Sequence, residues 1–279
     1  MFEDTAYMNG NTLRNRLHQG QRVYGTLVVS PSSFWPNTVR HSGADFVFID
    51  TEHIALDRET VSWMCRAYHA LGLPPVVRVP SPDPFEACKV LDGGACGVIA
   101  PYVESADEVR TLVGAAKLRP LKGRRLAEAL HSPATMQAEL HEYLQRRNAD
   151  IVLIVNIESV PALEKLDEIL SVPGLDGVLI GPHDLSCSLG IPEQYRHPRF
   201  NDAVCTIIRK TRAAGLGVGV HFWEGLDLEV QWARAGANLI MHSSDVVLFG
   251  QTLRRELTEI RQALADLPEP GGNEDVEIV

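Results

Sequence analysis

The sequence has few cysteines, no surplus of basic residues and no long apolar run. Its five cysteines are odd in number and show no Cys-x-x-Cys spacing, which argues against a disulfide framework or a zinc knuckle and favours a reducing cytoplasm. No stretch approaches the roughly 18 consecutive apolar residues of a membrane helix, and the first thirty residues hold no apolar segment typical of a secretory signal. We therefore expect a cytoplasmic protein with no membrane partner.

Basic residues are outnumbered, with 26 Lys and Arg against 36 Asp and Glu and a formal net charge of −10. Because phosphate contacts need a surplus of Lys and Arg on one face, we expect no nucleic-acid partner. Four of the acids lie in the last eleven residues with no base among them, so we expect residues 268–279 to form an acidic disordered tail. Residues 1–267 have the length of one α/β domain.

The sequence does contain a repeating pattern of short apolar runs. Most are continuous rather than alternating and rich in β-branched residues, as expected for parallel strands covered on their outer face. There are eight such runs, at residues 23–29, 46–49, 75–79, 97–100, 151–155, 177–180, 217–220 and 238–241.

Amphipathic segments lie between these runs and predict helices. The clearest are residues 58–71, 159–169, 203–214 and 250–264. Strand and helix alternating eight times predict an α/β fold of the (β/α)8 TIM barrel type, in a single domain. A doubly wound open sheet is the alternative, although the first run is not followed by the Gly-x-Gly-x-x-Gly motif of dinucleotide-binding folds.

One segment, residues 118–150, is too long for a plain connection. It carries a basic cluster made of Arg119, Lys122, Arg124 and Arg125. Long connections in barrels are often functional, and a solvated linker with a short helix is the alternative.

Polar residues gather where the apolar runs end. Because the carboxyl ends of parallel barrel strands meet at one rim, where barrel enzymes hold their active sites, we expect these side chains to lie together. They are Asp50, Glu52, His53, Arg78, Glu158, His183, Asp184, His221 and His242.

Local structural roles would also explain several of these residues one at a time. Asp184 could cap a short helix, and Glu158 could favour the start of another through its dipole. Arg78 could form a structural ion pair with Asp50 or with the acid two residues further on. His53 could be an ordinary surface histidine.

Taken together, the rim residues predict chemistry on a 2-oxo acid. Two carboxylates from adjacent strand ends suit a hard divalent cation such as Mg²⁺ or Mn²⁺, which can bind a 2-oxo acid and stabilise its enolate. Arg78 would add positive charge at the same oxygen. His53, oriented by Asp50, could transfer the proton of the aldehyde-side hydroxyl near neutral pH.

The sequence resembles the HpcH/HpaI aldolase family, the metal-dependent (class II) pyruvate aldolases of the phosphoenolpyruvate-binding barrel superfamily. The Asp-x-Glu-His and Gly-Pro-x-Asp-Leu pieces are its more specific motifs. The resemblance covers about residues 20–264, and the stretches that carry it are residues 43–53, 75–80, 91–101, 154–158 and 180–186.

The resemblance implies a role for each matching residue. Glu158 and Asp184 would hold the divalent metal, Mg²⁺ or Mn²⁺ with Co²⁺ as a further option. Arg78 would contact the keto oxygen, and His53 with Asp50 would handle the proton.

The segment Gly181-Pro182-His183-Asp184 would bind the substrate, with the pyruvate carboxylate on the backbone N–H groups around His183 and Asp184, as helix N-termini do for anions. The resemblance also implies a homo-oligomer, typically a hexamer, in which neighbours exchange the last helix, here residues 250–264. Packing of that helix on its own barrel is the alternative.

Four positions depart from the pattern of the family. They are the stretch 123–131, Asn37, His183 and His221. The proposed metal residues and Arg78 are unaffected, so the departures bear mainly on the aldehyde partner.

We therefore expect a carbon–carbon lyase that reversibly cleaves a 4-hydroxy-2-oxo acid, for example a 2-keto-3-deoxy sugar acid, to pyruvate and an aldehyde. One alternative is a malyl- or citramalyl-CoA lyase, in which the basic cluster would neutralise the phosphates of CoA. Another is a barrel that only binds a 2-oxo acid.

Overall fold

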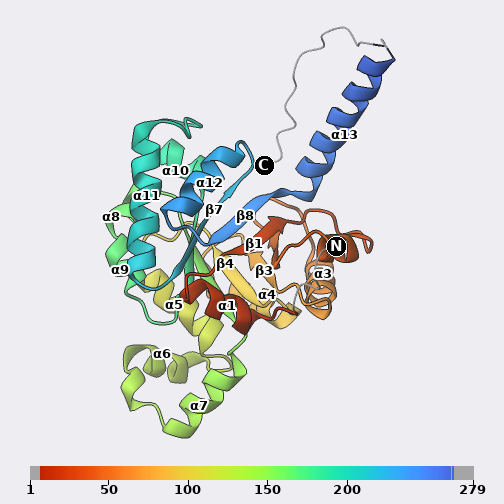
Figure 1. Ribbon diagram of the computed structural model, residues 1–279. Coiled ribbons are helices and arrows are strands. Elements are labelled where there is room, and N and C mark those ends of the chain that lie inside the picture. The colour runs from red at the N-terminus through yellow and green to blue at the C-terminus, as the bar shows by residue number, and fades with distance from the viewer. Residues whose placement is uncertain (1–6, 265, 267–279) are drawn as a thin grey trace.

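Eight parallel strands close into a barrel in the computed structural model, which describes residues 7–264 and 266 (Figure 1). Each strand pairs with its neighbours in chain order, and the last pairs with the first. The predicted (β/α)8 barrel is therefore confirmed, and the open sheet is excluded. The strands are β1 (Val23–Leu27), β2 (Phe46–Asp50), β3 (Pro75–Arg78), β4 (Gly97–Ala100), β5 (Val152–Ile157), β6 (Gly177–Ile180), β7 (Gly217–Phe222) and β8 (Leu239–Ser244).

Helices connect the strands and surround most of the barrel. Those of the first half are α1 (Gly10–His18), α2 (Trp35–Arg40), α3 (Arg58–Ala70), α4 (Pro84–Gly93), α5 (Ala106–Lys117), α6 (Gly123–His131) and α7 (Ala138–Arg147), with a 3₁₀ turn at Pro133–Thr135. Those of the second half are α8 (Val160–Glu164), α9 (Leu166–Leu170), α10 (Pro182–Ser188), α11 (Pro198–Ala213), α12 (Leu226–Ala235) and α13 (Asp245–Ala263). None of the helices within the described ranges is long and apolar enough to span a bilayer.

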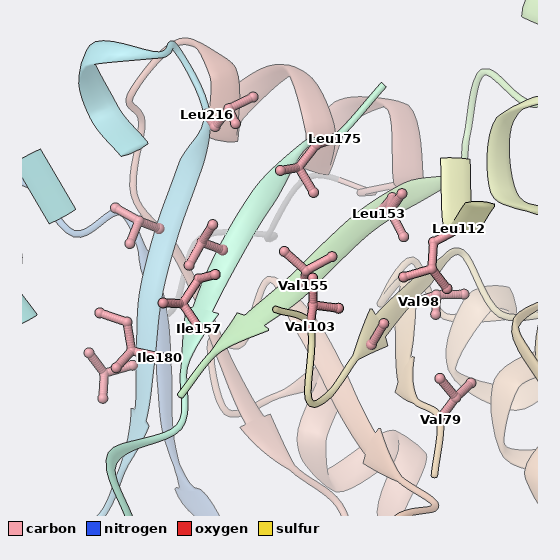
Figure 2. Packing of buried hydrophobic residues seen from close by; sticks show 14 of the residues in the cluster. Val79, Val98, Val103, Leu112, Leu153, Val155, Ile157, Leu175, Ile180 and Leu216 are labelled. Atoms are coloured by element: carbon pink, nitrogen blue, oxygen red, sulfur yellow. The ribbon is translucent and has the colours of Figure 1, made fainter. Parts of the chain in front are cut away.

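The continuous apolar strands serve two cores because successive side chains point to opposite faces. On β5, Leu153, Val155 and Ile157 point outward into the core under the helices, as Figure 2 shows. Val152 and Ile154 of the same strand belong to the core inside the barrel. Both faces of the strands are buried, so their sequences do not alternate between polar and apolar residues.

Helix α1 closes the barrel at the amino ends of its strands. Its Leu13 and Leu17 are fully buried and belong to the core inside the barrel. Asn238, just before β8, donates its side-chain amide to the carbonyl of Leu17 at 2.8 Å. The opposite end, at the carboxyl ends of the strands, is therefore the one available for a site.

Two predicted elements differ from the structure. Residues 159–169 form two short helices, α8 and α9, rather than one, with a break at Lys165. Residues 118–150 contain α6 and α7 rather than a linker with one short helix, and they connect the end of α5 to the start of β5. An α-to-β connection lies at the amino ends of the strands, so this excursion is remote from the carboxyl rim.

The last helix, α13, projects away from the barrel (Figure 1). It begins at Asp245, five residues before the predicted start at 250, and every described residue from Leu248 to Leu264 is exposed. Packing on its own barrel is therefore excluded for this helix. The proposed tail, residues 268–279, and the end of the proposed domain at 267 lie outside the described residues.

Candidate active site

Arg78, the last residue of β3, is fixed in the mouth of the barrel by Asp50, the last residue of β2. Its Nε and Nη2 donate to the two carboxylate oxygens of Asp50 at 2.8 and 2.7 Å, and the register of the sheet places the two residues opposite each other. Burial alone would raise the pKa of Asp50, but the hydrogen bonds and charge of Arg78 outweigh it and lower this pKa. The structural ion pair considered for Arg78 is therefore real.

Asp50 also shapes the turn that carries His53. Its carboxylate accepts the backbone N–H groups of Glu52 and His53, at 3.0 and 3.3 Å. The imidazole of His53 is paired with Glu52 instead, with Nε2 at 3.6 Å from Oε2. Asp50 thus orients His53 through the backbone of the turn and not through its ring.

Glu52 is a buried carboxylate that the assigned roles did not include. Its Oε2 lies 3.0 Å from Arg78 Nε, but that N–H is directed at Asp50, and Oε2 has no hydrogen bond within the described residues. A hydrogen bond to the Glu52 carboxylate raises the pKa of Tyr102, which follows β4 and has a φ of 55°. Glu52 therefore joins the two sides of the mouth.

Glu158 follows β5 directly and is 5% exposed. Its Oε1 accepts the backbone N–H of Tyr102 at 2.8 Å, and its Oε2 accepts the amide of Asn156 at 2.8 Å. Burial is the largest effect on its pKa and raises it, and the charges of Asp184 and Glu52 raise it further. The side chain faces the other acids and not the start of α8, so the helix-dipole interpretation of Glu158 does not hold.

Asp184 lies in the first turn of α10 with an exposed carboxylate. The helix is capped by Gly181, with no side-chain hydrogen bond, so the interpretation of Asp184 as an N-cap is wrong. The carboxylate has no hydrogen bond or ion pair within the described part of the chain. His183 turns away, with its ring 3.7 Å from Glu193.

Glycine is required at position 181 for Glu158 to reach this place. A Cβ there would lie 2.3 Å from Glu158 Oε2, closer than any real contact. The backbone before α10 therefore forms the wall against which the Glu158 carboxylate rests. It also leaves the first N–H groups of α10, those of His183 and Asp184, without a side-chain acceptor.

The residues fit a divalent cation with several open positions. Asp50 is neutralised by Arg78, whereas burial raises the pKa of Glu158 and the charges of Asp184 and Glu52 add to that rise. No set of three His, Cys, Asp or Glu side chains in residues 7–264 has the arrangement of a complete metal site. Two carboxylates with the remaining positions open to water and substrate suit Mg²⁺ or Mn²⁺.

His221 and His242 take different positions at the ends of β7 and β8. His221 lies in the mouth, where its ring packs edge-on against Phe48 at 5.4 Å between centroids. His242 lies on the outer face, where its Nδ1 is 2.9 Å from Glu229 Oε1 of α12. The structure therefore brings all the expected rim residues to one end of the barrel, with His183 and His242 directed away from the centre.

Comparison with known proteins identifies the family. Residues 30–251 match the HpcH/HpaI aldolase/citrate lyase family. The chain belongs to this family. Both the resemblance proposed from the sequence motifs and the expectation of a carbon–carbon lyase are confirmed at this level.

Individual relatives agree in sequence and in fold. A protein of Escherichia coli O17:K52:H18 described as a 2-keto-3-deoxy-L-rhamnonate aldolase is 33% identical over 247 residues, or 88% of this chain and 92% of that protein. The crystal structure of an HpcH/HpaI aldolase from Desulfitobacterium hafniense DCB-2 superposes with a TM-score of 0.78 at 28% identity and covers 93% of this chain and 99% of its own. The structure of the citrate synthase SbnG gives 0.77 at 31%, covering 90% and 98%.

Proposed function

We propose that this enzyme cleaves a 4-hydroxy-2-oxo acid of the 2-keto-3-deoxy sugar acid class to pyruvate and an aldehyde, with Glu158 and Asp184 holding Mg²⁺ or Mn²⁺. The observation that carries the proposal is the charge arrangement of the mouth. One guanidinium is locked on Asp50, and a group of mutually repelling carboxylates stands beside it. A divalent cation matches the carboxylates, and the keto oxygen of a 2-oxo acid bound to that cation matches the guanidinium.

The chain's own residues supply a fixed positive charge and a proton acceptor. When the C3–C4 bond of the substrate breaks, its electron pair passes to C3 and negative charge develops on the former keto oxygen. Arg78, half-buried and held by two hydrogen bonds, would stabilise that oxygen without reorganising. A bound divalent cation would supply further stabilisation of the same enolate.

The proton of the C4 hydroxyl has to leave as the aldehyde forms. We assign His53 to this step, since its ring lies at the edge of the mouth beside Glu52 and a neutral imidazole accepts a proton near neutral pH. The free N–H groups at the start of α10 would hold the substrate carboxylate. Protonation of C3 then completes pyruvate.

The CoA-lyase alternative loses its main support. Its argument rested on the basic cluster of residues 119–125, but this segment lies at the amino ends of the strands, away from the mouth (Figure 1). Two acids also neutralise half of its charge, because Arg119 pairs with Asp92 and both Arg124 and Arg125 pair with Glu128.

For the assembly, we propose a homo-oligomer in which α13 docks on the barrel of a second copy. Elsewhere the outward residues of the strands are buried, but on β1 Tyr24 is 48% exposed, and Ile240 and His242 of β8 are half-buried. A hollow of about 510 Å³ continues this uncovered face toward Arg16 and Arg22. In such an assembly the exposed apolar side of α13 from one copy would cover the exposed face of β1 and β8 on the other.

The direct test is pyruvate release from a panel of 2-keto-3-deoxy acids, with chelator and with Mg²⁺ or Mn²⁺ added back. We expect turnover that chelator abolishes and metal restores. Glu158→Gln should lower kcat/KM by about 10²-fold, since it replaces a charged metal ligand by a neutral amide. The exposed Glu168→Gln, the same chemical change on α9, should leave turnover unchanged. Wild-type enzyme that releases no pyruvate under any metal would refute the proposal.

A further inference from the structure

His221 occupies the inner wall of the barrel, one layer above its apolar core. Gly217, Gly219 and His221 alternate along β7, and the register pairs His221 with Met241, which belongs to the inner core. The ring packs against Phe48 at 5.4 Å, and the same Phe48 ring carries the Arg78 guanidinium at 5.5 Å. His221 and Arg78 therefore share a neighbour and face the same space.

The hydrogen bond of His221 defines its tautomer. Its Nε2 lies 3.1 Å from the carbonyl oxygen of Ser243, and since a carbonyl only accepts, Nε2 carries the hydrogen. Burial lowers the pKa of His221 to about 4, so the ring is neutral at pH 7. Its Nδ1 then carries a lone pair and can accept a hydrogen bond. None of the described residues donates one to it, and Nδ1 is not one of the fully buried polar atoms that lack a partner.

Ser243, at the end of β8, offers a second unused group. It lies where the register between β1 and β8 shifts, so that Leu27 pairs with Ser244, and it has a φ of 51°, a left-handed conformation that is costly for serine. This backbone presents its carbonyl to His221. Its side chain is buried, with 2% of the residue exposed, and Oγ has no hydrogen bond within the described residues.

Unpaired buried polar atoms are costly and point to a missing partner. Two other such atoms, Glu52 Oε2 and Asn156 Oδ1, also belong to the mouth. The Ser243 hydroxyl and the acceptor nitrogen of His221 stand on the β7–β8 side, whereas the residues proposed to hold the metal and the pyruvate unit lie at or just after the ends of β3, β5 and β6. The substrate atoms that reach this side are those beyond the pyruvate unit.

We propose that His221 Nδ1 and Ser243 Oγ form a subsite that binds a hydroxyl group of the aldehyde half, so that the enzyme prefers uncharged, hydroxylated aldehydes. This inference rests on the proposed aldol cleavage and names its substrate class. A neutral acceptor nitrogen pairs with a hydroxyl donor and repels a carboxylate. An apolar aldehyde would leave both polar groups unpaired, and sites built on hydrogen bonds discriminate strongly against such analogues.

The test compares His221→Leu, His221→Gln and Ser243→Ala on two substrates. One is a 2-keto-3-deoxy sugar acid, which releases a hydroxylated aldehyde, and the other is 4-hydroxy-2-oxopentanoate, which releases acetaldehyde. We expect His221→Leu to lower kcat/KM about 100-fold on the first and less than threefold on the second. His221→Gln, which keeps an acceptor, should recover part of the loss, and Ser243→Ala should lower only the first activity. The exposed His131→Leu is the matched control.

Exchange of the methyl protons of pyruvate with deuterated water, followed by NMR, separates this inference from the one on which it rests. That exchange needs the enolate but no aldehyde, so it should be the same in wild type and His221→Leu. Loss of exchange in the variant, or an equal loss on both substrates, would overturn the subsite. Wild-type enzyme with neither exchange nor cleavage would instead overturn the proposed function.

Discussion

Arg78 stays charged in a half-buried position because Asp50 lies opposite it on the next strand. Removing one partner of such a pair leaves an uncompensated charge, whereas changing the shape of the cation tests its geometry. Lysine keeps the charge but cannot donate two parallel hydrogen bonds. Replacing Arg78 by lysine therefore tests whether the position of the positive charge matters, and not only its presence.

We expect Arg78→Lys to lower kcat for pyruvate release by about 10²–10³, the usual effect of displacing a charge that stabilises an oxyanion. The matched control is Arg196→Lys, because Arg196 makes the same two-bond pair with Asp227 at 2.7 and 3.0 Å but on the surface. The control should keep wild-type kcat. A kcat for Arg78→Lys within threefold of wild type would show that the guanidinium geometry is not used.

At this scale the sequence predicted the residues of the mouth better than their contacts. Asp50, Arg78, Glu158 and Asp184 reach one end of the barrel because strand ends must meet there. Asn156 and Glu52 were not assigned roles, although each stands two residues from an assigned acid and so shares its face. The partner of the His53 ring depends on the turn after β2, and no periodicity fixes a turn.

Among the helices, α13 has an apolar stripe in its sequence but a solvent-exposed position in the structure. From Phe249 onward its apolar side chains recur at helical spacing on one stripe, yet they are exposed in the single chain. The stripe consists of Phe249, Leu253, Leu257, Ile260 and Leu264. This exposed stripe supports the proposal that a second copy of the chain covers α13.

Leu253→Glu combined with Leu257→Glu should reduce the assembly to a smaller species in size-exclusion chromatography with light scattering. Two charges would otherwise be buried without partners in the interface. The control, Gln251→Glu with Gln262→Glu, adds two charges on the opposite face of α13 and should keep the mass of the wild type. An unchanged mass for the Leu variants, or a monomeric wild type, would contradict the exchange of α13.

The strands were predicted within a few residues because a buried parallel strand is a short, continuous, β-branched run, whatever follows it. Helices were less well defined. The single helix expected at residues 159–169 breaks at Lys165, and α9 beyond the break packs on α5 and α11. For residues 118–150 the sequence lacks a strong start signal, since neither α6 nor α7 has a side-chain cap.

Across the whole molecule, the two ends of the barrel hold acidic groups of opposite character. At the carboxyl ends the acids outnumber the basic Arg78, and we propose that two of them hold a cation. At the amino ends Asp176, just before β6, is fully paired: it accepts from His18 of α1 at 3.0 Å, from Lys117 of α5 and from the backbone N–H of Leu153 at 2.8 Å. In barrels this end serves stability, while the other end serves chemistry.

This difference gives a prediction about acid stability. Burial alone would raise the pKa of Asp176, but its hydrogen bonds with His18 and Lys117 outweigh burial and lower it. A carboxyl whose folded-state pKa is lowered contributes stability above its unfolded pKa, about 3.9, and loses it as the pH falls through the folded value. Asp176→Asn should therefore cost about 3–5 kcal/mol at pH 7, because Lys117 stays buried without its counter-charge.

Urea unfolding of wild type and Asp176→Asn between pH 7 and pH 3 checks this sign. The difference between the two free energies of unfolding should stay constant down to about pH 4 and then narrow as the wild-type carboxylate is protonated. Asp107→Asn, which alters a 90% exposed acid paired with Arg110, should change the free energy of unfolding by less than about 0.5 kcal/mol. A difference that widens on acidification would mean that Asp176 is already protonated in the native barrel, and the closure of its amino end by α1 and α5 would then have to rest on apolar packing alone.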